Sequence, residues 1–321
     1  MRVDPGALSV LSTLREAGFR ALLAGGCVRD MLMGNEPVDW DIATDAGPDQ
    51  VGELFPRTLP VGAHFGISVV LIDRGQYEVA RFRRDGPYLD GRHPARVEPA
   101  DESADAQRRD FTINGLFYDP FQNEIIDYVG GRDDIERGLV RAIGDPHARF
   151  SEDYLRLLRC VRFVARFDFS IDDSTRMALS ALADGIGSIA AERVEEELTR
   201  MLTDPGAVRG LELMMESGLL SAILPELARL RGVEQPPEFH PEGDVWTHSL
   251  LVMGQLDNPV PELAWAALLH DIGKEPTFEV RDRIRFNRHD IVGAKMAEAI
   301  CRRLRMSNAR TERIGELVAK H

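Results

Sequence analysis

A short apolar run leads into a glycine pair and a helix start in Leu23-Ala24-Gly25-Gly26-Cys27-Val28-Arg29-Asp30. Glycines between a strand and a helix let the backbone approach a phosphate closely, and the N–H groups of the helix start and the Arg29 guanidinium add positive potential. A Gly-Gly pair alone more often marks only a tight turn. The interpretation as a phosphate-binding turn therefore depends on the residues further along the chain.

Two aspartates alternate in a strand pattern shortly afterwards, in Val38-Asp39-Trp40-Asp41-Ile42, part of an expected strand Val38–Ala43. A period of two places both carboxylates on the same face of that strand. Oxygen-only carboxylate pairs suit Mg²⁺, and two such ions can hold the attacking and leaving oxygens in phosphoryl transfer. We therefore predict a magnesium site rather than a solvent-facing strand edge. Glu78, on a later strand, is a candidate third carboxylate, with structural pairing to an arginine as an equal alternative.

The hydrophobic periodicity divides the 321 residues into a mixed first part and a helical remainder. We expect an α+β protein with domains at residues 1–145, 146–232 and 233–321, the last boundary lying in the Pro- and Gly-rich run 232–243. The first expected elements are a helix at 7–17 and strands at 20–24, 66–72 and 77–82, the last two joined by a hairpin-like turn at 73–76. Later expected helices run from an N-cap at Ser151 to Phe167, and over 173–183, 191–202 and 207–217.

Composition excludes several classes of protein. The formal net charge of −14 argues against nonspecific coating of nucleic acid, which depends on neutralising many phosphates. No run approaches the ~20 apolar residues that span a bilayer, and the N-terminus lacks the order of a signal peptide. The three cysteines, Cys27, Cys160 and Cys301, fit neither a disulfide framework nor a thiolate zinc site. We expect a cytoplasmic protein without a membrane partner, and the sequence leaves its oligomeric state open.

Two further motifs complete a recognisable series: Arg108-Arg109-Asp110-Phe111-Thr112-Ile113-Asn114-Gly115 and Glu152-Asp153-Tyr154-Leu155-Arg156. With the glycine turn and the aspartate pair, they resemble in order the motifs of the class II tRNA nucleotidyltransferases and bacterial poly(A) polymerases, within the polymerase-β nucleotidyltransferase superfamily. Gly115 stands where this family usually has alanine. The resemblance implies an N-terminal nucleotidyltransferase domain with a mixed sheet and helices, followed by an all-α neck.

The resemblance also implies roles for individual residues. Asp39 and Asp41 would hold the catalytic Mg²⁺ ions. The residues that would lie against the incoming nucleotide are Gly25, Gly26, Arg29, Arg109, Asp110, Asp153, Arg156, Arg159 and Arg162. In this assignment the glycines and Arg29 contact the triphosphate, Arg109 and Asp110 lie near the ribose, and Asp153 and Arg156 read the base, with the last two arginines nearby.

The base-reading assignment has a physical argument of its own. Positions 153, 156, 159 and 162 step by three, so on a helix neighbouring members can touch. C and A both present an amino donor beside a ring-nitrogen acceptor, which an Asp/Arg pair can complement, whereas G and U would leave buried groups unpaired. The protein itself would then act as the template. The alternative for such a pair is an ordinary salt bridge on a helix surface.

Two other segments resemble parts of the family. The turn-rich, arginine-dense segment 81–96 resembles the flexible loop of enzymes that add A, which disfavours an enzyme that adds only CC. The helices after Ser170, including Glu192–Leu198, resemble the neck, and we interpret their charges as solvated faces beside an apolar seam.

The C-terminal part resembles an HD domain, a helical bundle whose histidines and aspartates bind one or two divalent metals for phosphate-ester hydrolysis. The resemblance implies His248, His270 and Asp271 as candidate ligands, a set that suits transition metals as well as Mg²⁺. No aspartate follows Asp290, so the last ligand of the family is absent, is replaced, or lies beyond His321. His289 and Asp290 are candidates for a substitute, although the resemblance places them as accessory residues.

We therefore predict template-independent addition of CMP and AMP, from CTP and ATP, to the 3′ end of tRNA, dependent on Mg²⁺. Alternatives with the same chemistry are addition of A alone and poly(A) synthesis. The alternative of another class is an HD-type metal phosphohydrolase whose N-terminal half binds RNA ends. A noncatalytic RNA-end-binding protein would require both metal sites to be vestigial.

Overall fold

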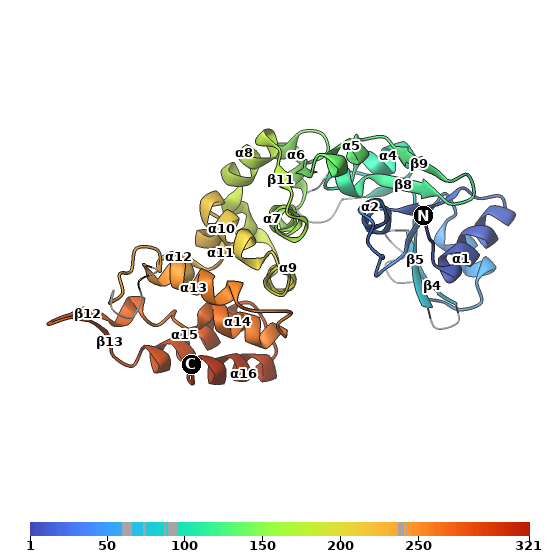
Figure 1. The fold of residues 1–321 in the computed structure, drawn as a ribbon. Coiled ribbons are helices and arrows are strands. Elements are labelled where there is room, and N and C mark those ends of the chain that lie inside the picture. The colour runs from blue at the N-terminus through green and yellow to red at the C-terminus, as the bar shows by residue number, and fades with distance from the viewer. Residues whose placement is uncertain (60–65, 73–74, 87, 89–95, 237–240, 242) are drawn as a thin grey trace. The chain divides into compact units, whose positions relative to one another are not determined.

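The computed structural model describes residues 1–59, 66–72, 75–86, 88, 96–236, 241 and 243–321. It divides the chain into two compact units, Met1–Glu152 and Asp153–His321 (Figure 1). In the described ranges, no helix is long and apolar enough to cross a membrane. The α+β class expected from the sequence is confirmed. The finer division into three domains stays a prediction.

A mixed seven-stranded sheet forms the centre of the N-terminal unit, in the order β3-β4-β5-β2-β1-β8-β9. Strands β2 and β5 run parallel, and the other neighbours in this sheet are antiparallel. The antiparallel pairing of β4 and β5 confirms the expected hairpin. The strands are β1 (Ala21–Ala24), β2 (Asp41–Thr44), β3 (Thr58–Leu59), β4 (Ile67–Ile72), β5 (Gly75–Arg81), β8 (Leu116–Asp119) and β9 (Glu124–Asp127).

Helices cover this sheet because their apolar residues recur at helical spacing. The helix α1 buries Ala7, Val10, Leu11 and Leu14 and begins at Asp4, whose carboxylate accepts hydrogen bonds from the N–H groups of Gly6 and Ala7. The remaining elements of this unit are α1 (Pro5–Glu16), α2 (Gly26–Leu32), α3 (Pro48–Leu54), β6 (Arg83–Asp85), β7 (Val97–Pro99), α4 (Glu102–Gln107), η2 (Thr112–Asn114), α5 (Gly131–Glu136), β10 (Leu139–Val140) and α6 (Pro146–Glu152).

The C-terminal unit is helical apart from short strands. Its largest fully buried side chain is Trp265, whose indole N–H donates to the Thr199 hydroxyl at 2.8 Å. The first elements are α7 (Leu155–Phe167), β11 (Ser170–Ile171), α8 (Asp173–Ala181), η3 (Ala183–Ser188), α9 (Ala191–Leu202), α10 (Ala207–Ser217), α11 (Leu219–Ile223) and α12 (Pro225–Ala228). They are followed by α13 (Val245–Gly254), α14 (Pro261–Leu269), η4 (Glu275–Thr277), β12 (Phe278–Val280), β13 (Ile284–Phe286), α15 (His289–Arg303) and α16 (Asn308–Val318).

The predicted strand Val38–Ala43 is wrong at its start, because β2 begins only at Asp41. Its antiparallel partner β1 pairs Leu23 with Ile42 and ends at Ala24, where the chain turns into α2. Residues before Asp41 therefore have no partner on that side. Asp39 lies outside the strand and is exposed, so strand periodicity does not fix its direction.

The predicted continuous helix from Ser151 to Phe167 is also wrong. Ser151 lies inside α6 rather than at an N-cap, and α7 begins at Leu155. The Asp153 carboxylate accepts a hydrogen bond from the Leu155 N–H at 3.1 Å. An aspartate that binds the backbone two residues ahead competes with helix continuation, which accounts for the break between α6 and α7.

Several expectations concern segments that are only partly described. In the predicted loop 81–96, residues 87 and 89–95 lie outside the described residues, and the strands β6 and β7 flank them. Residues 237–240 and 242 of the predicted boundary lie outside as well, as do residues 73 and 74 of the hairpin turn.

Candidate functional site

The pairing of β2 with β5 brings two of the predicted carboxylates side by side. Asp41 is directly opposite Glu78 in the parallel register. Burial raises the pKa of Asp41 to about 6, and the neighbouring charges of Glu78 and Asp39 raise it further, against Arg109 and Arg29. Asp39, although it precedes the strand, is therefore within electrostatic range of Asp41. The three carboxylates share a region whose own cations do not fully compensate them.

Glu78 belongs to this acidic group rather than to an arginine pair. Burial raises the pKa of Glu78, and Asp39 adds to the rise while Arg83 opposes it. The Arg83 guanidinium forms its ion pair with Asp85, at 3.1 Å. In the part of the chain that the structure describes, no arginine forms an ion pair with Glu78. Glu78 thus lies opposite Asp41 and within the electrostatic influence of Arg83, and its role as a third carboxylate stays a prediction.

The glycine turn joins β1 to α2 beside an arginine. Gly25 has φ +70°, a conformation that disfavours every residue with a side chain. A Cβ on Gly25 would also lie 2.7 Å from Nη1 of Arg109, so a side chain there would displace the guanidinium. The turn therefore keeps the backbone open and Arg109 close to it.

A hydrogen-bond network ties the turn to the second motif. The buried Arg29 donates through Nη1 to Oδ1 of Asn114 at 2.6 Å and through Nη2 to Asp30 at 2.7 Å. The Asn114 amide donates in turn to Asp110 at 3.0 Å. Sequence reasoning quoted Asn114 inside its motif but gave it no role. Only the fold shows that Asn114 faces the buried Arg29, because the two residues are far apart in the sequence.

Asp105 is a second residue that sequence reasoning missed. It is 1% exposed and accepts hydrogen bonds from Arg108 at 2.6 Å and from Arg109 at 2.9 Å. Burial opposes ionisation of Asp105, but the two guanidinium groups outweigh burial and hold the pKa of Asp105 below its usual value. Its position three and four residues before the arginines in the sequence was a usable signal. Asp105 thus fixes both arginines of the motif.

One of the two predicted base readers, Asp153, is held by a residue of α9. Arg193 donates to both oxygens of Asp153, at 3.3 and 2.8 Å. Arg156 follows on α7 and is buried. Asp153 precedes α7, so only Arg156, Arg159 and Arg162 of the expected helical series lie on this helix.

Arg162 and Arg159 converge on one buried carboxylate. Glu197 is 6% exposed, and it pairs with Arg162 at 2.7 Å and with Arg159 at 3.7 Å. Burial lowers the pKa of Arg162, and Glu197 opposes that shift. The interpretation of the 192–198 charges as solvated faces is therefore wrong for Arg193, which pairs with Asp153, and for Glu197, which pairs with α7. Val194 and Leu198 are buried and form the apolar seam.

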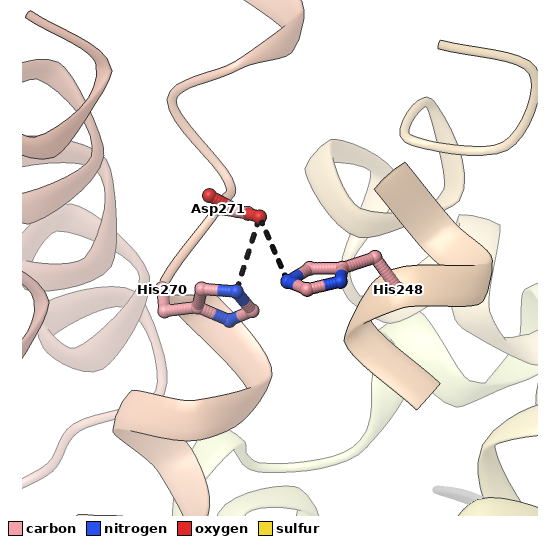
Figure 2. Close-up of side chains that lie close together, drawn as sticks. All are labelled: His248, His270 and Asp271. Atoms are coloured by element: carbon pink, nitrogen blue, oxygen red, sulfur yellow. Dashed lines mark ion pairs between the residues drawn. The ribbon is translucent and has the colours of Figure 1, made fainter. Parts of the chain in front are cut away.

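A cluster of histidines surrounds Asp271 in the C-terminal unit. Figure 2 shows His248 from α13 and His270 from the end of α14, both directed at one oxygen of this carboxylate (Figure 2). Their Nε2 atoms lie 3.6 and 3.0 Å from Oδ2. These atoms all lie within 4.8 Å of one another, a spacing that one metal ion can bridge.

The other oxygen of Asp271 faces a second pair of histidines. Nε2 of His289 and of His321 each lie 3.6 Å from Oδ1, and the two rings contact each other at 3.2 Å. Asp271, His289 and His321 form a second group with metal-ligand spacing. Of the two accessory candidates, His289 joins the cluster and Asp290 does not, and His321, which was not singled out, is in it.

Three of these histidines are oriented in the same way. Nδ1 of His270, His289 and His321 lies 2.8, 2.9 and 2.6 Å from the backbone carbonyl three residues earlier. A carbonyl only accepts, so Nδ1 carries a proton and Nε2 is the nitrogen that faces Asp271, where it donates when protonated and is free to bind a metal when neutral. A backbone partner that fixes the tautomer is the usual support of a metal-binding imidazole.

Lys274 completes this cluster and was also missed. It is buried and donates to Asp271 and to Gln235, both at 2.7 Å. Burial opposes ionisation of Asp271, but His270, His321 and Lys274 hold its pKa well below the usual range. Asp271 in turn raises the pKa of His321. Among the described residues, only this unit contains groups of three ligand atoms with metal spacing, while the β2–β5 carboxylates are spaced more widely.

Three protein-family models match the chain in succession. The "Poly A polymerase head domain" covers residues 21–141, the "Probable RNA and SrmB- binding site of polymerase A" covers 168–230, and the "HD domain" covers 245–321. They contain the β2–β5 carboxylates, the α9 partners and the Asp271 cluster, respectively. The chain belongs to the family of the class II tRNA nucleotidyltransferases and bacterial poly(A) polymerases.

Relatives and solved structures agree with this assignment. A CCA-adding enzyme of Geobacillus thermodenitrificans is 42% identical over 223 residues, which is 69% of this chain and 55% of that protein. The crystal structure of the Bacillus stearothermophilus CCA-adding enzyme in complex with CTP matches 99% of this chain and 70% of its own, at TM-score 0.76 and 29% identity. A tRNA nucleotidyltransferase complexed with a primer tRNA and an incoming ATP analog matches 81% and 74%, at TM-score 0.60 and 27% identity. The chain spans about half the length of curated relatives such as these CCA-adding enzymes.

Proposed function

We propose that this protein is a metal-dependent nucleotidyltransferase that adds CMP and AMP, from CTP and ATP, to the 3′ end of tRNA. The observation that carries the proposal is the placement of Asp41 opposite Glu78, next to the Gly25 turn, in a chain related to CCA-adding enzymes. We place its action in the cytoplasm, where tRNA is matured.

The residues present fit a divalent cation. Asp39, Asp41 and Glu78 offer oxygen atoms only, which suits Mg²⁺. Burial is the main cause of the raised pKa of Asp41, and Glu78 and Asp39 add negative charge that a cation would neutralise. Asp39 and Asp41 would hold the ions, with Glu78 as a third carboxylate. When bound, Mg²⁺ would lower the proton affinity of the attacking 3′-hydroxyl and neutralise the leaving pyrophosphate.

The surrounding residues serve the triphosphate. The Gly25 turn leaves room for a phosphate beside the backbone, and Gly26 begins α2 with its N–H groups at the same place. Arg109 is held next to this turn by Asp105, and Arg29 is held by Asn114. Fixed cations cost no reorganisation when charge develops on the phosphates, so the network supports transfer electrostatically.

The same proposal assigns base selection to Asp153 and Arg156. The Arg193 ion pair fixes the Asp153 carboxylate, and Asp153 also accepts from the Leu155 N–H, so its orientation is set before a base arrives. Replacement of Arg156 by alanine should relax the preference for CTP and ATP over UTP and GTP about tenfold or more, because a donor to the base is lost. Single-nucleotide incorporation with each triphosphate measures this preference, and unchanged selectivity would remove Arg156 from the role.

One experiment tests the overall proposal and separates its variants. Purified protein is incubated with tRNAs that end before CCA, after the second C and after the terminal A, with each triphosphate supplied separately. CCA addition predicts that CTP extends the first substrate by the two C residues, that ATP extends the second to the mature length, and that neither extends the third. Growth only after the second C indicates an A-adding enzyme, and continued growth of the third substrate indicates a poly(A) polymerase.

The Asp271 cluster supports a second activity, hydrolysis of phosphate esters by a divalent metal. Imidazole and carboxylate ligands suit transition metals as well as Mg²⁺, and the two groups that share Asp271 offer places for one or two ions. Release of inorganic phosphate or opening of a 2′,3′-cyclic phosphate tests this activity. If it occurs without any nucleotide incorporation, the protein is a phosphohydrolase with an RNA-binding N-terminal half. If neither reaction occurs, it is a noncatalytic RNA-end-binding protein.

A further inference from the structure

A short hairpin of the C-terminal unit extends away from its helices. The strands β12 and β13 pair antiparallel, with Phe278 opposite Phe286 and Val280 opposite Ile284 (Figure 1). Alternation along paired strands places these four apolar residues on one face of the hairpin. We call residues 278–288 the arginine hairpin.

The apolar face of the arginine hairpin is partly open to solvent. Phe278 is 41% exposed and Val280 is 64% exposed. The rings of Phe278 and Phe286 contact each other, with centroids 5.9 Å apart. Two exposed strands with an aromatic pair do not form a core, so this face is suited to contact another molecule.

The same hairpin is rich in arginine. Residues 278–288 contain four arginines against two carboxylates, in a chain whose net charge is −14. Arg281 pairs with Glu279 and Arg285 with Asp282, both at 2.8 Å. Arg283 and Arg288 are exposed and form no ion pair with any residue in the described ranges. The hairpin thus carries uncompensated positive charge in the same short segment as its exposed aromatic residue.

The base of the arginine hairpin contacts the Asp271 cluster. The Phe286 carbonyl accepts from Nδ1 of His289, and the two rings lie 6.3 Å apart. Nζ of Lys274, which binds Asp271, lies 5.4 Å from the centre of the Phe286 ring. A molecule stacked on the hairpin would therefore reach the histidines directly.

We propose that the arginine hairpin binds single-stranded RNA and directs its terminus to the Asp271 cluster. Arginines form ion pairs with the phosphates of an RNA backbone, and exposed aromatic rings stack on bases regardless of the RNA sequence. An acidic protein segment would pair with the arginines but would not stack on the flat aromatic face. RNA can do both, through its phosphates and its bases. This inference rests on the proposed action on tRNA, and it extends that action to the second site, whose substrate would be an RNA chain rather than a small phosphate ester.

The test uses the full chain and a labelled twelve-nucleotide RNA with a 3′-phosphate and an internal 4-thiouridine. Since this RNA lacks a 3′-hydroxyl, it is not a primer for nucleotide addition. Ultraviolet crosslinking should attach it to peptides from residues 278–288. Binding followed by fluorescence anisotropy should weaken about tenfold in the double variant R283E/R288E, and the salt dependence of log K should fall by ~1.4, which corresponds to two lost phosphate contacts.

Arg305→Glu is the matched control, because Arg305 is also exposed and without an ion pair among the described residues, but it lies outside the hairpin. It should bind RNA within about twofold of the wild type. Phe278→Ala should weaken binding fivefold or more if bases stack there. Since Phe278 is exposed, this variant is expected to fold.

Three results would overturn the proposal. The first is crosslinking confined to residues outside 278–288, and the second is RNA binding by the hairpin variants that equals that of the wild type. The third is a change in the sedimentation of the hairpin variants with unchanged RNA binding, which would make the face a contact between copies of the chain. Incorporation of labelled CMP and AMP by the wild type is measured in parallel. Incorporation with no hairpin crosslink refutes the hairpin proposal alone, and a hairpin crosslink with no incorporation refutes the nucleotidyltransferase proposal while supporting RNA binding.

Discussion

Asp41 and Asp271 are both shielded from solvent, yet their pKa values move in opposite directions. Around Asp41, burial and then the Glu78 carboxylate raise the pKa most, Asp39 adds to the rise, and Arg109 and Arg29 only partly oppose it, so that the pKa rises to about 6. Around Asp271, His270, His321 and Lys274 outweigh burial, and its pKa falls. Neighbouring charge, rather than burial alone, thus sets the behaviour of each carboxylate.

The difference has a consequence for cation binding. The β2–β5 carboxylates repel one another, so a divalent cation would relieve an existing electrostatic cost. Asp271 already has a cationic partner, and a metal there competes with Lys274 and with protons on the histidines. We therefore expect the first site to bind a cation well only above the pKa of Asp41, and the second to favour metals that bind imidazole strongly.

The largest effect should follow removal of the carboxylates at the first site. Asp41→Ala or Asp39→Ala should reduce incorporation of CMP and AMP at least about a thousandfold, because the cations lose their ligands. Primer-extension assays measure the rate, and circular dichroism confirms that the variants fold. Asp49→Asn, an exposed aspartate on α3, is the control and should remain active. Incorporation by either alanine variant at the wild-type rate would refute the assignment.

A smaller effect should follow removal of the charge at the second site. Asp271→Asn should weaken binding of Mn²⁺ to the C-terminal unit about a hundredfold, because both groups of ligands share this carboxylate. Asparagine keeps an oxygen acceptor for Lys274, which limits the loss of stability. Calorimetric titration of the full chain in the Asp39→Ala background isolates this site. Asp290→Asn is the matched control, because Asp290 lies outside both groups; equal losses in the two variants would show that Asp271 is no ligand.

The sequence predicted some parts of both sites better than others. The helices α9 and α10 have the bounds expected from their apolar spacing, since that pattern is a local property. Asp41 and Glu78 were identified, but the start of β2 was placed too early, because it depends on where the partner strand β1 ends. The alternation of residues along one strand does not indicate where the neighbouring strand ends.

Charge pairing between residues far apart in the chain could not be predicted from the sequence. Arg193 reaches Asp153 across 40 positions, and Arg162 reaches Glu197 across 35. On a helix, such charged residues look the same as those of a solvated face. His321 was overlooked for a related reason, because the search for a last metal ligand looked for an aspartate. Only the arrangement of helices shows that its imidazole faces Asp271.

The smallest expected effect is on stability, and its sign differs between the two sites. The pKa of Asp41 is about 6 in the folded protein, against an ordinary value of 3.8. The folded state therefore binds a proton more tightly than the unfolded state, and this group's contribution to stability is lost as the pH rises from about 4 to about 6. Asp271, whose pKa is lowered, contributes stability above its ordinary value and loses it as the pH falls.

Asp41→Asn removes the charge and should stabilise the metal-free protein at pH 7.5 by about 1–3 kcal/mol, which follows from the shift of about two pKa units reduced by solvent screening. The corresponding unfolding midpoint in EDTA should rise by roughly 2–10 °C, and the gain should shrink as the pH approaches 4. Added Mg²⁺ should cancel the advantage at pH 7.5, since only the wild type gains a bound cation. A gain that is constant with pH would mean that repulsion among Asp39, Asp41 and Glu78 is not its source, and the contrast with Asp271 would then fail.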